Sequence, residues 1–317
     1  MITPKLSLVL PIFNEEESIP ELFERITEAM SKTGHSYEVI AVNDGSRDSS
    51  QIALSKIALA DPRIRVIHFR INAGQTAAIQ AGIEHARGEI IIPLDSDLEN
   101  DPSDIVVLLA KLDEGYDVVS GWRKNRWADK KLLRKLPSIL ANKLISKISG
   151  TYLHDYGCTL KAYRKEVIKD VQLYGEMHRF IPAYAAQMGA RVTEVEVSYA
   201  PRKYGKSKYG FSRTLRVLLD LLVLRFMHKY KDRPIQFFGL IGAVVAALGF
   251  LAGLVAIVLR FTIDLHLVQT PLPTLAAFLV IVGVQLITMG ILAEMVMRTY
   301  YESQGKKAYL IKETINL

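Results

Sequence analysis

The stretch Glu89-Ile-Ile-Ile-Pro-Leu-Asp-Ser-Asp-Leu-Glu-Asn-Asp-Pro102 decides how this chain of 317 residues is interpreted. Its apolar run, Ile90 to Leu94, predicts a short buried strand. The strand leads into Asp95 and Asp97, with Glu99 two residues further on. Grouped carboxylates are costly to bury without a cation among them, and all-oxygen ligands favour Mg²⁺ or Mn²⁺. The stretch therefore indicates a divalent metal site that holds phosphates. A polar turn followed by a helix N-cap is the structural alternative.

Apolar runs and helical segments alternate through the first half of the chain. This alternation predicts an α/β fold with a mainly parallel sheet covered by helices on both faces. No Gly-rich dinucleotide fingerprint and no P-loop follows any expected strand, which disfavours a Rossmann dehydrogenase and a nucleoside triphosphatase. A further strand is expected at Val192–Val197 and a further helix near Arg179–Met188. The first expected strands are Leu6–Ile12, Tyr37–Val42, Ile64–Phe69, Glu89–Leu94 and Asp117–Ser120, and the first helices Glu15–Ser31, Ser49–Ala60, Gly74–Ala86 and Pro102–Leu112.

Candidate functional residues follow each of the five strands. In a parallel sheet the carboxyl ends of the strands lie at one edge, which is the usual place for a ligand. Any one group has a simpler explanation, since Asn-Asp-Gly-Ser is a good turn in its own right. Five groups at one edge predict an active site instead. The groups are Leu10–Glu16, Val42–Ser46, Asn72–Gln75, Asp95–Asp97 and Gly121–Arg123.

The C-terminal part has a different character. The whole chain is 50% hydrophobic with a mean hydropathy of +0.16. Ile235–Leu259 and Leu272–Ala293 contain no charged residue, and each exceeds the roughly 20 residues that cross a bilayer. We expect two transmembrane helices. Basic residues precede the first span and follow the second. By the positive-inside rule, both termini are therefore expected in the cytoplasm. Small residues in the first span, such as Gly239 and Gly242, offer packing positions for a homo-oligomer.

Charge and cysteine content narrow the class of protein. The net charge of +7 is concentrated in residues 121–147 and 201–233. Apolar residues recur at helical spacing among the basic ones, which favours helices in the membrane interface over nucleic-acid binding. A helix packed on the core with a solvated basic face is the alternative. The run Leu6–Phe13 does not resemble a signal peptide, and the single Cys158 fits a reducing compartment.

Residues 6–210 resemble a family 2 nucleotide-sugar glycosyltransferase of the GT-A fold. The segment at residues 155–164, together with Gly-Lys-Ser-Lys-Tyr at 205–209, is similar to the dolichol-phosphate mannose synthase branch. The two spans resemble bacterial polyprenyl-phosphate glucosyltransferases. Phe13 stands where the family often has Tyr, and Glu99 where Gln is common. The matching pieces are Leu-Pro-Ile-Phe-Asn-Glu-Glu (10–16), Val-Asn-Asp-Gly-Ser (42–46), Asn-Ala-Gly-Gln (72–75), Asp-Ser-Asp-Leu-Glu-Asn-Asp-Pro (95–102) and Asp-Tyr-Gly-Cys-Thr-Leu-Lys-Ala-Tyr-Arg (155–164).

The resemblance implies an inverting, metal-dependent transfer of a hexose from a nucleotide sugar to polyprenyl phosphate. Glucose from UDP-glucose is the first choice, and mannose or a modified pentose is the alternative. The expected parts are a cytoplasmic GT-A catalytic domain (1–210), a juxtamembrane amphipathic helix (211–233), a transmembrane hairpin (234–298) and a cytoplasmic tail (299–317). The expected location is a prokaryotic inner or plasma membrane, and no nucleic-acid partner is expected.

Two rival functions stay open at this point. A processive polysaccharide synthase shares the first half, but its Gln-x-x-Arg-Trp signature has only a near miss here, Arg123-Lys124-Asn125-Arg126-Trp127, without the Gln. A membrane-anchored nucleotide-sugar sensor would keep the fold without catalysis. The acidic residues at the strand ends argue against it.

The resemblance also implies roles on the donor side. Pro11, Phe13 and Glu15 line the nucleoside pocket, and Asp44 accepts a hydrogen bond from the base. Asp95 and Ser96 lie next along the edge. Asp97 and Glu99, with Asp95, hold Mg²⁺ or Mn²⁺ against the donor diphosphate. For Glu15, an exposed acid at a helix N-terminus is the structural alternative.

On the acceptor side, cations must hold the lipid phosphate. Arg123 and Arg126 lie just beyond the fifth strand, and arginine binds phosphate in a bidentate manner. Lys206 and Lys208 are expected on a loop that closes over donor or acceptor, with contacts to the membrane surface as the alternative. Asp155 is the candidate general base. Because phosphate is largely dianionic at neutral pH, Asp155 has a second possible role in orienting the acceptor.

Overall fold

The computed structural model describes residues 3–126, residues 142–204 except 144, 148, 170 and 172–176, isolated positions between 281 and 299, and residues 309–317. The chain divides into two compact units. The first contains Met1–Leu221 and Ala308–Leu317, and the second contains Leu222–Lys307. The fold and the site described below belong to the first unit.

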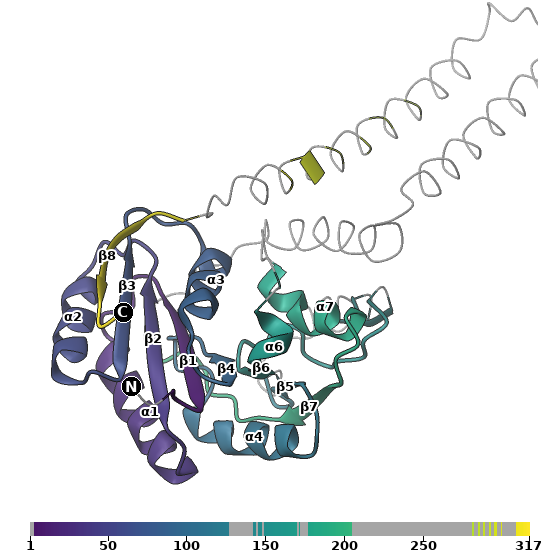
Figure 1. Ribbon diagram of the computed structural model, residues 1–317, viewed down its shortest axis with the longest axis horizontal. Helices are drawn as coiled ribbons and strands as arrows, with labels where there is room; N and C mark the ends of the chain where they lie inside the picture. The colour runs from purple at the N-terminus through teal and green to yellow at the C-terminus, as the bar shows by residue number, and fades with distance from the viewer. Residues whose placement is uncertain are drawn as a thin grey trace, which may run out of the picture. The chain divides into compact units, whose positions relative to one another are not determined.

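Within the described residues, one eight-stranded sheet forms the centre of the first unit, in the order β7-β5-β6-β4-β1-β2-β3-β8 (Figure 1). Strands β4, β1, β2 and β3 are parallel neighbours, and β5 is parallel to β7. Strands β6 and β8 run antiparallel to their neighbours. The predicted mainly parallel sheet is confirmed. The strands are β1 Leu6–Ile12, β2 Tyr37–Asn43, β3 Ile64–Phe69, β4 Ile90–Pro93, β5 Val118–Trp122, β6 Lys161–Arg164, β7 Val192–Glu196 and β8 Ile311–Ile315.

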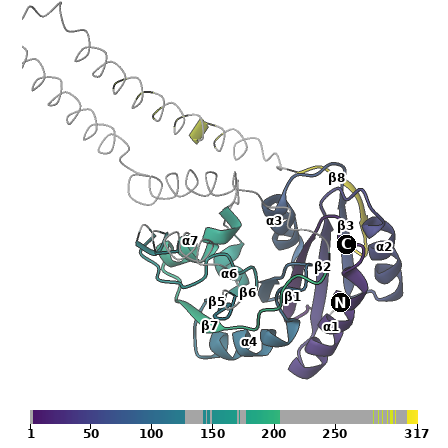
Figure 2. The same ribbon diagram turned by 180° about the vertical axis from the view of Figure 1, so that it is seen from behind.

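Helices cover both faces of the sheet, as Figures 1 and 2 show. One apolar cluster packs α1, α2 and α4 against one face, and a second packs α3, α6 and α7 against the other. Strand β1 is buried along its whole length because it contributes to both clusters. The helices are α1 Ile19–Thr33, α2 Ser50–Ala60, α3 Gln75–His85, α4 Ile105–Asp113, α6 Lys165–Ile168 and α7 Ile181–Gln187, with short 3-10 helices η1 Pro102–Asp104 and η2 Met177–Phe180.

Two expected helix starts differ from the structure for local reasons. The first helix begins at Ile19 and not at Glu15, because residues 14–18 form a loop that starts with Asn14 in the left-handed region (φ 50°). The helix expected from Pro102 opens as η1 before it continues as α4. The carboxylate of Asp101 accepts from Ser103 N at 2.8 Å and caps this start. The N-cap alternative is therefore correct for Asp101.

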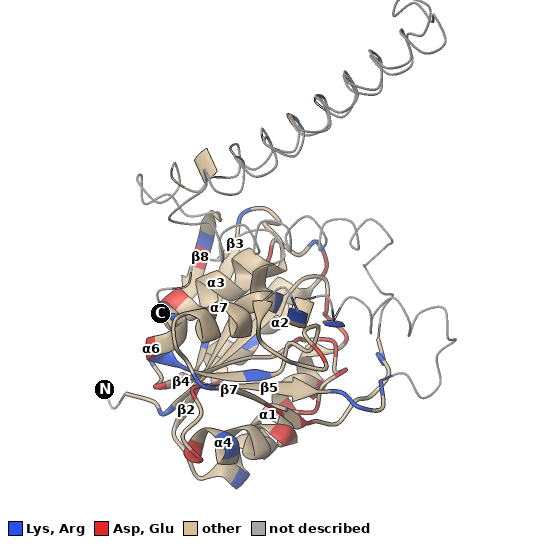
Figure 3. Ribbon diagram, turned by 90° about the vertical axis from the view of Figure 1, so that its right-hand side faces the viewer, with Lys and Arg blue, Asp and Glu red and all other residues tan. Residues whose placement is uncertain are grey.

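Strand β8 adds the C-terminal residues to the edge of the eight-stranded sheet. It lies in the segment expected as a tail and pairs antiparallel with β3. Before it, the Tyr309 ring stacks on Phe69 (centroids 4.8 Å apart) and its hydroxyl donates to Glu84 Oε2 at 2.6 Å. The charged residues of β8, coloured blue and red on the ribbon in Figure 3, are exposed. Exposed charges on an edge strand disfavour pairing with another chain.

The membrane predictions fall largely outside the described residues. The span Ile235–Leu259 and residues 211–233 are not described. The span Leu272–Ala293 is described only at isolated helical positions such as Ile281 and Leu292. Of the basic helix expected after residue 131, only positions from 142 to 149 are described. Across the described parts of the chain, no helix combines the length and apolarity needed to cross a membrane.

Replacing Tyr309 with Phe should lower the free energy of unfolding by about 1–2 kcal/mol, because it removes the hydrogen bond to Glu84 and keeps the stacking on Phe69. The measurement is thermal unfolding of the full-length protein. Tyr152→Phe is the matched control, since the Tyr152 side chain is 81% exposed. Equal effects of the two substitutions would contradict a stabilising role for the docked C-terminus.

Candidate active site

Loops at the carboxyl ends of β1, β2 and β4 meet at one edge of the sheet. The three strands are parallel, so their ends lie side by side. Asn14 N donates to Ser46 Oγ at 2.9 Å, which joins the β1 and β2 loops. Ser96 Oγ donates to the Pro11 carbonyl at 3.1 Å, which joins β4 to β1. Because β6 is antiparallel to β4, it begins at this edge and brings residues 155–160 there.

The Asp44 carboxylate organises the loop that follows β3. Its Oδ2 accepts from Asn72 Nδ2 (2.8 Å) and Gly74 N (2.9 Å), and its Oδ1 accepts from Ala73 N (2.6 Å). Burial raises the pKa of Asp44 to about 6, against the lowering effect of the two backbone hydrogen bonds. A carboxylate has about four lone-pair positions, so three donors leave about one position for a further donor.

The Asp95 carboxylate joins two other parts of the site. Gln75 Nε2, at the start of α3, donates to Oδ1 at 2.7 Å, and Thr159 Oγ1 donates to Oδ2 at 2.6 Å. Burial raises the pKa of Asp95, and the negative charge of Asp97 adds to the effect. Asp95 therefore carries a charge whose environment favours a nearby cation.

A strained turn presents Asp97 and Glu99. Leu98, between them, has φ 61°, a left-handed conformation that is rare for a bulky residue. Its side chain is 4% exposed and packs in the apolar cluster of α1 and α4. Asp97 Oδ1 accepts from Glu99 N at 3.1 Å, which closes the turn. Packing of Leu98 holds the strained backbone and fixes where the two carboxylates begin.

Arginines balance the charge of these two carboxylates. Arg202 forms an ion pair with Asp97, whose side chain is buried. Arg123 NH1 lies 3.7 Å from Glu99 Oε2. The negative charge at the end of β4 is thus held against two guanidinium groups from different parts of the chain.

Arg123 and Asp155 form a buried, two-point ion pair. Arg123 Nε donates to Asp155 Oδ2 at 2.8 Å, and Arg123 NH2 donates to Oδ1 at 3.2 Å. Arg126 NH1 lies 3.9 Å from the same carboxylate. Burial alone would raise the pKa of Asp155, but the charge and hydrogen bonds of Arg123 outweigh it and hold the pKa below its ordinary value. Asp155 is therefore ionised at neutral pH and weakly basic.

The other residues predicted for the site have varied surroundings. Pro11 is buried at the end of β1, and Phe13 is half-buried just beyond it. Glu15 is buried, and its charge acts on Arg202, which places it on the Asp97 side of the edge. The alternative for Glu15, an exposed acid at a helix N-terminus, is wrong because the residue is buried. Lys206 and Lys208 lie outside the described residues.

The donor atoms at the end of β4 suit a hard divalent cation. Within the described ranges, no three His, Cys, Asp or Glu side chains are grouped as a metal site. Asp95, Asp97 and Glu99 nevertheless interact electrostatically, and the charge of Asp97 and Glu99 is balanced by guanidinium groups. Carboxylate oxygens whose charge requires a cation are the ligands that Mg²⁺ and Mn²⁺ prefer. The chemistry of the residues fits such an ion.

Sequence reasoning assigned no role to three residues that bind the carboxylates of the site. Gln75 and Thr159 bind Asp95, and Arg202 binds Asp97. Gln75 and Thr159 lie inside motifs that support the family resemblance, so these motifs could have selected them as candidate site residues. Arg202 precedes the Gly-Lys-Ser-Lys-Tyr segment by a few residues, and its basic neighbourhood alone could not select it.

Gly45→Ala should separate the β2 and β3 loops. A Cβ at Gly45 would lie 2.6 Å from both Asn72 N and Ile71 C, and φ there is +66°. We expect a loss of about 2–4 kcal/mol in unfolding free energy, because a backbone clash adds to left-handed strain. Gly34→Ala is the matched control: φ is +67° with nothing within 4 Å, so only about 1 kcal/mol of strain is expected. Equal losses in denaturant unfolding would contradict the close approach.

Comparison with known proteins identifies the class. The glycosyl transferase family 2 model matches residues 7–172. The chain is 45% identical over 313 residues to dodecaprenyl-phosphate galacturonate synthase of Rhizobium johnstonii, covering 98% of this chain and 92% of that protein. It is 36% identical over 315 residues to undecaprenyl-phosphate 4-deoxy-4-formamido-L-arabinose transferase of Proteus mirabilis, covering 99% of this chain and 94% of that protein.

Solved structures share the fold. Glucosyl-3-phosphoglycerate synthase from Mycobacterium tuberculosis in complex with phosphoglyceric acid has a TM-score of 0.55 at 19% identity, covering 70% of this chain and 80% of that one. The same enzyme with Mn²⁺, uridine diphosphate and phosphoglyceric acid has a TM-score of 0.53 at 17% identity, covering 70% and 78%. The likeness shows an α/β fold of the GT-A kind.

The protein is thus a glycosyltransferase with a GT-A-like fold. It belongs to glycosyl transferase family 2, and its curated relatives are polyprenyl-phosphate sugar transferases. The family predicted from the sequence motifs is confirmed.

Proposed function

We propose that this enzyme transfers a sugar from a nucleotide sugar to polyprenyl phosphate with inversion at the anomeric carbon. The observation that carries the proposal is the relationship to dodecaprenyl-phosphate galacturonate synthase, 45% identity over 98% of this chain. The acidic edge of the sheet, with arginines beside it, provides groups for both an anionic donor and an anionic acceptor.

The nucleoside of the donor is proposed to bind between the β1 and β2 loops. Pro11 and the half-buried Phe13 supply the apolar surface, and Phe13 supplies the aromatic ring on which the base stacks. Glu15 accepts from the ribose. Asp44 uses its remaining capacity for the base, and its three hydrogen bonds to the β3 loop keep its carboxylate in one position.

The diphosphate of the donor is proposed to lie over Asp97 and Glu99, which with Asp95 hold Mg²⁺ or Mn²⁺. Such an ion stabilises negative charge on the departing nucleotide. Solved structures with the same fold contain Mn²⁺ or Mg²⁺ with uridine diphosphate. Arg202, which pairs with Asp97 in this structure, is proposed to bind the diphosphate through its guanidinium.

The lipid phosphate is proposed to bind at Arg126, with Lys206 and Lys208 as further contacts. The Arg126 side chain is 28% exposed, whereas Arg123 is 3% exposed and directed at Asp155. Arg123 therefore serves to hold Asp155 and to add positive charge behind the phosphate. This division refines the expectation that Arg123 and Arg126 both bind the phosphate.

The acceptor phosphate is proposed to act without a strong base. One of its oxygens forms the new bond to the anomeric carbon, and the bond from that carbon to the donor diphosphate breaks, which releases the nucleoside diphosphate. A phosphate monoester is largely dianionic at neutral pH, so no proton has to be removed. The lowered pKa of Asp155 supports a role in orienting the acceptor rather than in proton removal. Positioning and electrostatics then supply most of the acceleration.

The membrane is proposed as the place of reaction, through the two predicted spans and their basic flanks. The first unit contains the chain on both sides of the second unit, up to Leu221 and again from Ala308. An even number of crossings returns a chain to the side from which it left, so this arrangement supports a two-span hairpin with a cytoplasmic catalytic domain. The small residues of the first span support a homo-oligomer.

The donor is proposed to be a UDP-sugar, and the experiment below is designed to identify which sugar it carries. The first expectation was glucose, whereas the two relatives named above carry galacturonate and formamido-arabinose in their names. Purified full-length enzyme is incubated with polyprenyl phosphate, Mn²⁺ and a panel of radiolabelled nucleotide sugars. Label in the organic phase supports the proposal and identifies the sugar. A folded enzyme that moves no label from any donor would contradict it.

A further inference from the structure

The loop between β3 and α3, residues 70–74, holds the Asp44 carboxylate. Asn72, Ala73 and Gly74 supply the three hydrogen bonds to that carboxylate described above. Residues 70–72 of the loop are exposed, and the Ile71 side chain is 62% exposed. Because an exposed loop has little apolar packing to fix it, its position depends on the strand before it and the helix after it.

Strand β8 lies along β3 (Figures 1 and 2) and reaches the first residue of this loop. Phe69 pairs with Ile311, and the next residue, Arg70, donates its N–H to the Leu310 carbonyl at 2.9 Å. The register shifts between His68 and Phe69, as in a β-bulge. A bulge changes the local direction of a strand pair, and this one lies where β8 meets the loop.

The Tyr309 side chain joins the strand before the loop to the helix after it. Its ring is 5% exposed and stacks on Phe69, the last residue of β3, with the ring planes 10° apart. Its hydroxyl donates to Oε2 of Glu84, in the last turn of α3, at 2.6 Å. A change in the Tyr309 side chain therefore acts on both elements that carry the loop.

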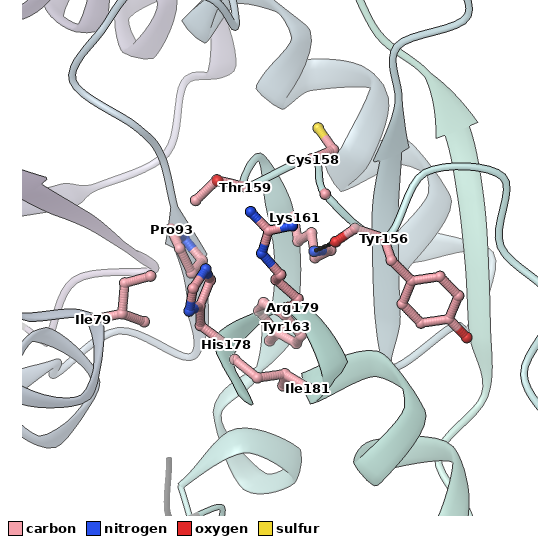
Figure 4. A pocket seen from close by; sticks show the side chains of 11 residues that line it. Ile79, Pro93, Tyr156, Cys158, Thr159, Lys161, Tyr163, His178, Arg179 and Ile181 are labelled. Atoms are coloured by element: carbon pink, nitrogen blue, oxygen red, sulfur yellow. Dashed lines mark hydrogen bonds between the residues drawn. The ribbon is translucent and has the colours of Figure 1, made fainter. Parts of the chain in front are cut away.

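Helix α3 connects the same contact to a second carboxylate of the site. Its first residue, Gln75, donates to Asp95 Oδ1 at 2.7 Å. Thr76 Oγ1 is hydrogen-bonded to His178 Nδ1 at 2.7 Å, and Ile79 lines the pocket shown in Figure 4 together with His178. The first turns of α3 thus contact the site, whereas its last turn contacts the C-terminal segment.

The far end of β8 contacts a different part of the sheet. Because β8 is antiparallel to β3, Ile315 and Asn316 lie near the start of β3. There Asn316 Nδ2 donates to the carbonyls of Ala58 (2.7 Å) and Ile64 (2.8 Å). Ala58 belongs to α2, and Ile64 is the first residue of β3, at the opposite end from the loop. The two ends of this strand therefore differ in whether they contact the loop.

We propose that Tyr309 is a positioning residue for donor binding. Its contacts with Phe69 and Glu84 set the position of residues 70–74, and that loop holds the Asp44 carboxylate in the orientation that binds the base. The inference rests on the proposed role of Asp44. Nucleotide binding and docking of residues 309–311 are then coupled, and by linkage each favours the other.

The test measures the Kd of UDP and of GDP, each with Mn²⁺, by calorimetry on the full-length protein. Tyr309→Leu removes the ring stack and the hydrogen bond, and should raise the Kd of the nucleotide that the wild type binds by about 5- to 20-fold, a usual size for coupled sites. Tyr309→Phe keeps the stack and should raise it less than about threefold. The KM of polyprenyl phosphate should stay within about twofold of wild type in both variants.

Asn316→Gly is the matched control on the same strand. It removes the two hydrogen bonds at the far end of β8, and Gly accepts the left-handed φ of 59° at this position. We expect lower thermal stability and a nucleotide Kd within about twofold of wild type. A folded Tyr309→Leu with unchanged nucleotide affinity would overturn the inference. Equal rises in Kd for Tyr309→Leu and Asn316→Gly, or a rise confined to the KM of polyprenyl phosphate, would also overturn it.

Hydrogen exchange on the wild type gives a second measurement that requires no variant. Saturating nucleotide with Mn²⁺ should slow exchange of the backbone amides of residues 310–315 at least about fivefold, because coupling is reciprocal. Strand β7, at the opposite edge of the sheet, should change less than about twofold. Exchange in residues 310–315 that nucleotide leaves unchanged would overturn the inference. A folded wild type that binds neither nucleotide would overturn the proposed function, and the inference with it.

Discussion

Asp97→Asn is expected to lower the turnover of sugar transfer by about 10²–10³-fold. Asp97 is buried at the active edge, on a turn fixed by the strained Leu98, so the substitution changes charge with little change in shape. An amide lacks the negative charge that a divalent cation requires, and loss of preorganised charge stabilisation has effects of this size. Arg202 also loses its ion-pair partner. The measurement is label transfer to lipid at saturating donor.

Asp101→Asn is the matched control for this substitution. Asp101 lies on the same loop, but its carboxylate caps η1 by accepting from Ser103 N. Asn is an equally good N-cap, so stability and transfer should stay within about twofold of wild type. If Asp97→Asn kept more than a tenth of the wild-type turnover, or if both variants lost it equally, the proposed role of Asp97 would be wrong.

Arg123→Ala is expected to cost about 3–5 kcal/mol in unfolding free energy and most of the transfer activity. The Arg123 and Asp155 side chains are 3% and 9% exposed, so removing one leaves the other charge buried without its partner. Chemical denaturation of the full-length protein measures the loss. The double variant Arg123→Met with Asp155→Leu should recover part of the stability, because both buried charges are gone, and none of the activity.

Lys124→Ala is the control for the ion pair. Lys124 is the next residue, and its ion pair with Glu196 is exposed, with both side chains at 55%. An exposed pair contributes about 0–1 kcal/mol, so this variant should be close to wild type. A loss in Arg123→Ala no larger than in Lys124→Ala would mean that the buried pair does not hold the site together. Full recovery of transfer in the double variant would contradict the role of Asp155.

Much of the fold could be predicted from the sequence because the parallel strands are apolar and bounded by polar turns. Strand β1 and strand β3 have their predicted limits. Strand β6 was missed because it is only four residues long and begins and ends with a basic residue, Lys161 and Arg164. Strand β8 was missed because its exposed Lys312 and Glu313 give no apolar pattern. Its pairing with β3 depends on contacts more than 240 positions away in the chain.

The position of the strand-end carboxylates at one edge of the sheet could be predicted from the sequence, but their hydrogen-bond and ion-pair partners could not. Parallel topology brings strand ends together, so Asp44, Asp95 and Asp97 were placed at one edge from their positions after strands. Which partner each carboxylate meets depends on loop conformations, such as Gly45 and Gly74 at φ +66° and +95°. These conformations are not visible in a hydrophobic pattern. Arg202 and Asp97 are 105 residues apart in the sequence, and this spacing does not indicate that they are in contact.

The most direct test of the account measures both products of one reaction. Wild-type enzyme, polyprenyl phosphate and the donor identified by the panel are mixed, and nucleoside diphosphate and glycosylated lipid are counted over time. The account predicts one nucleoside diphosphate for each lipid carrying a single sugar, and no reaction with the corresponding polyprenol. Nucleoside diphosphate released without glycosylated lipid, or a lipid carrying a growing chain of sugars, would contradict it.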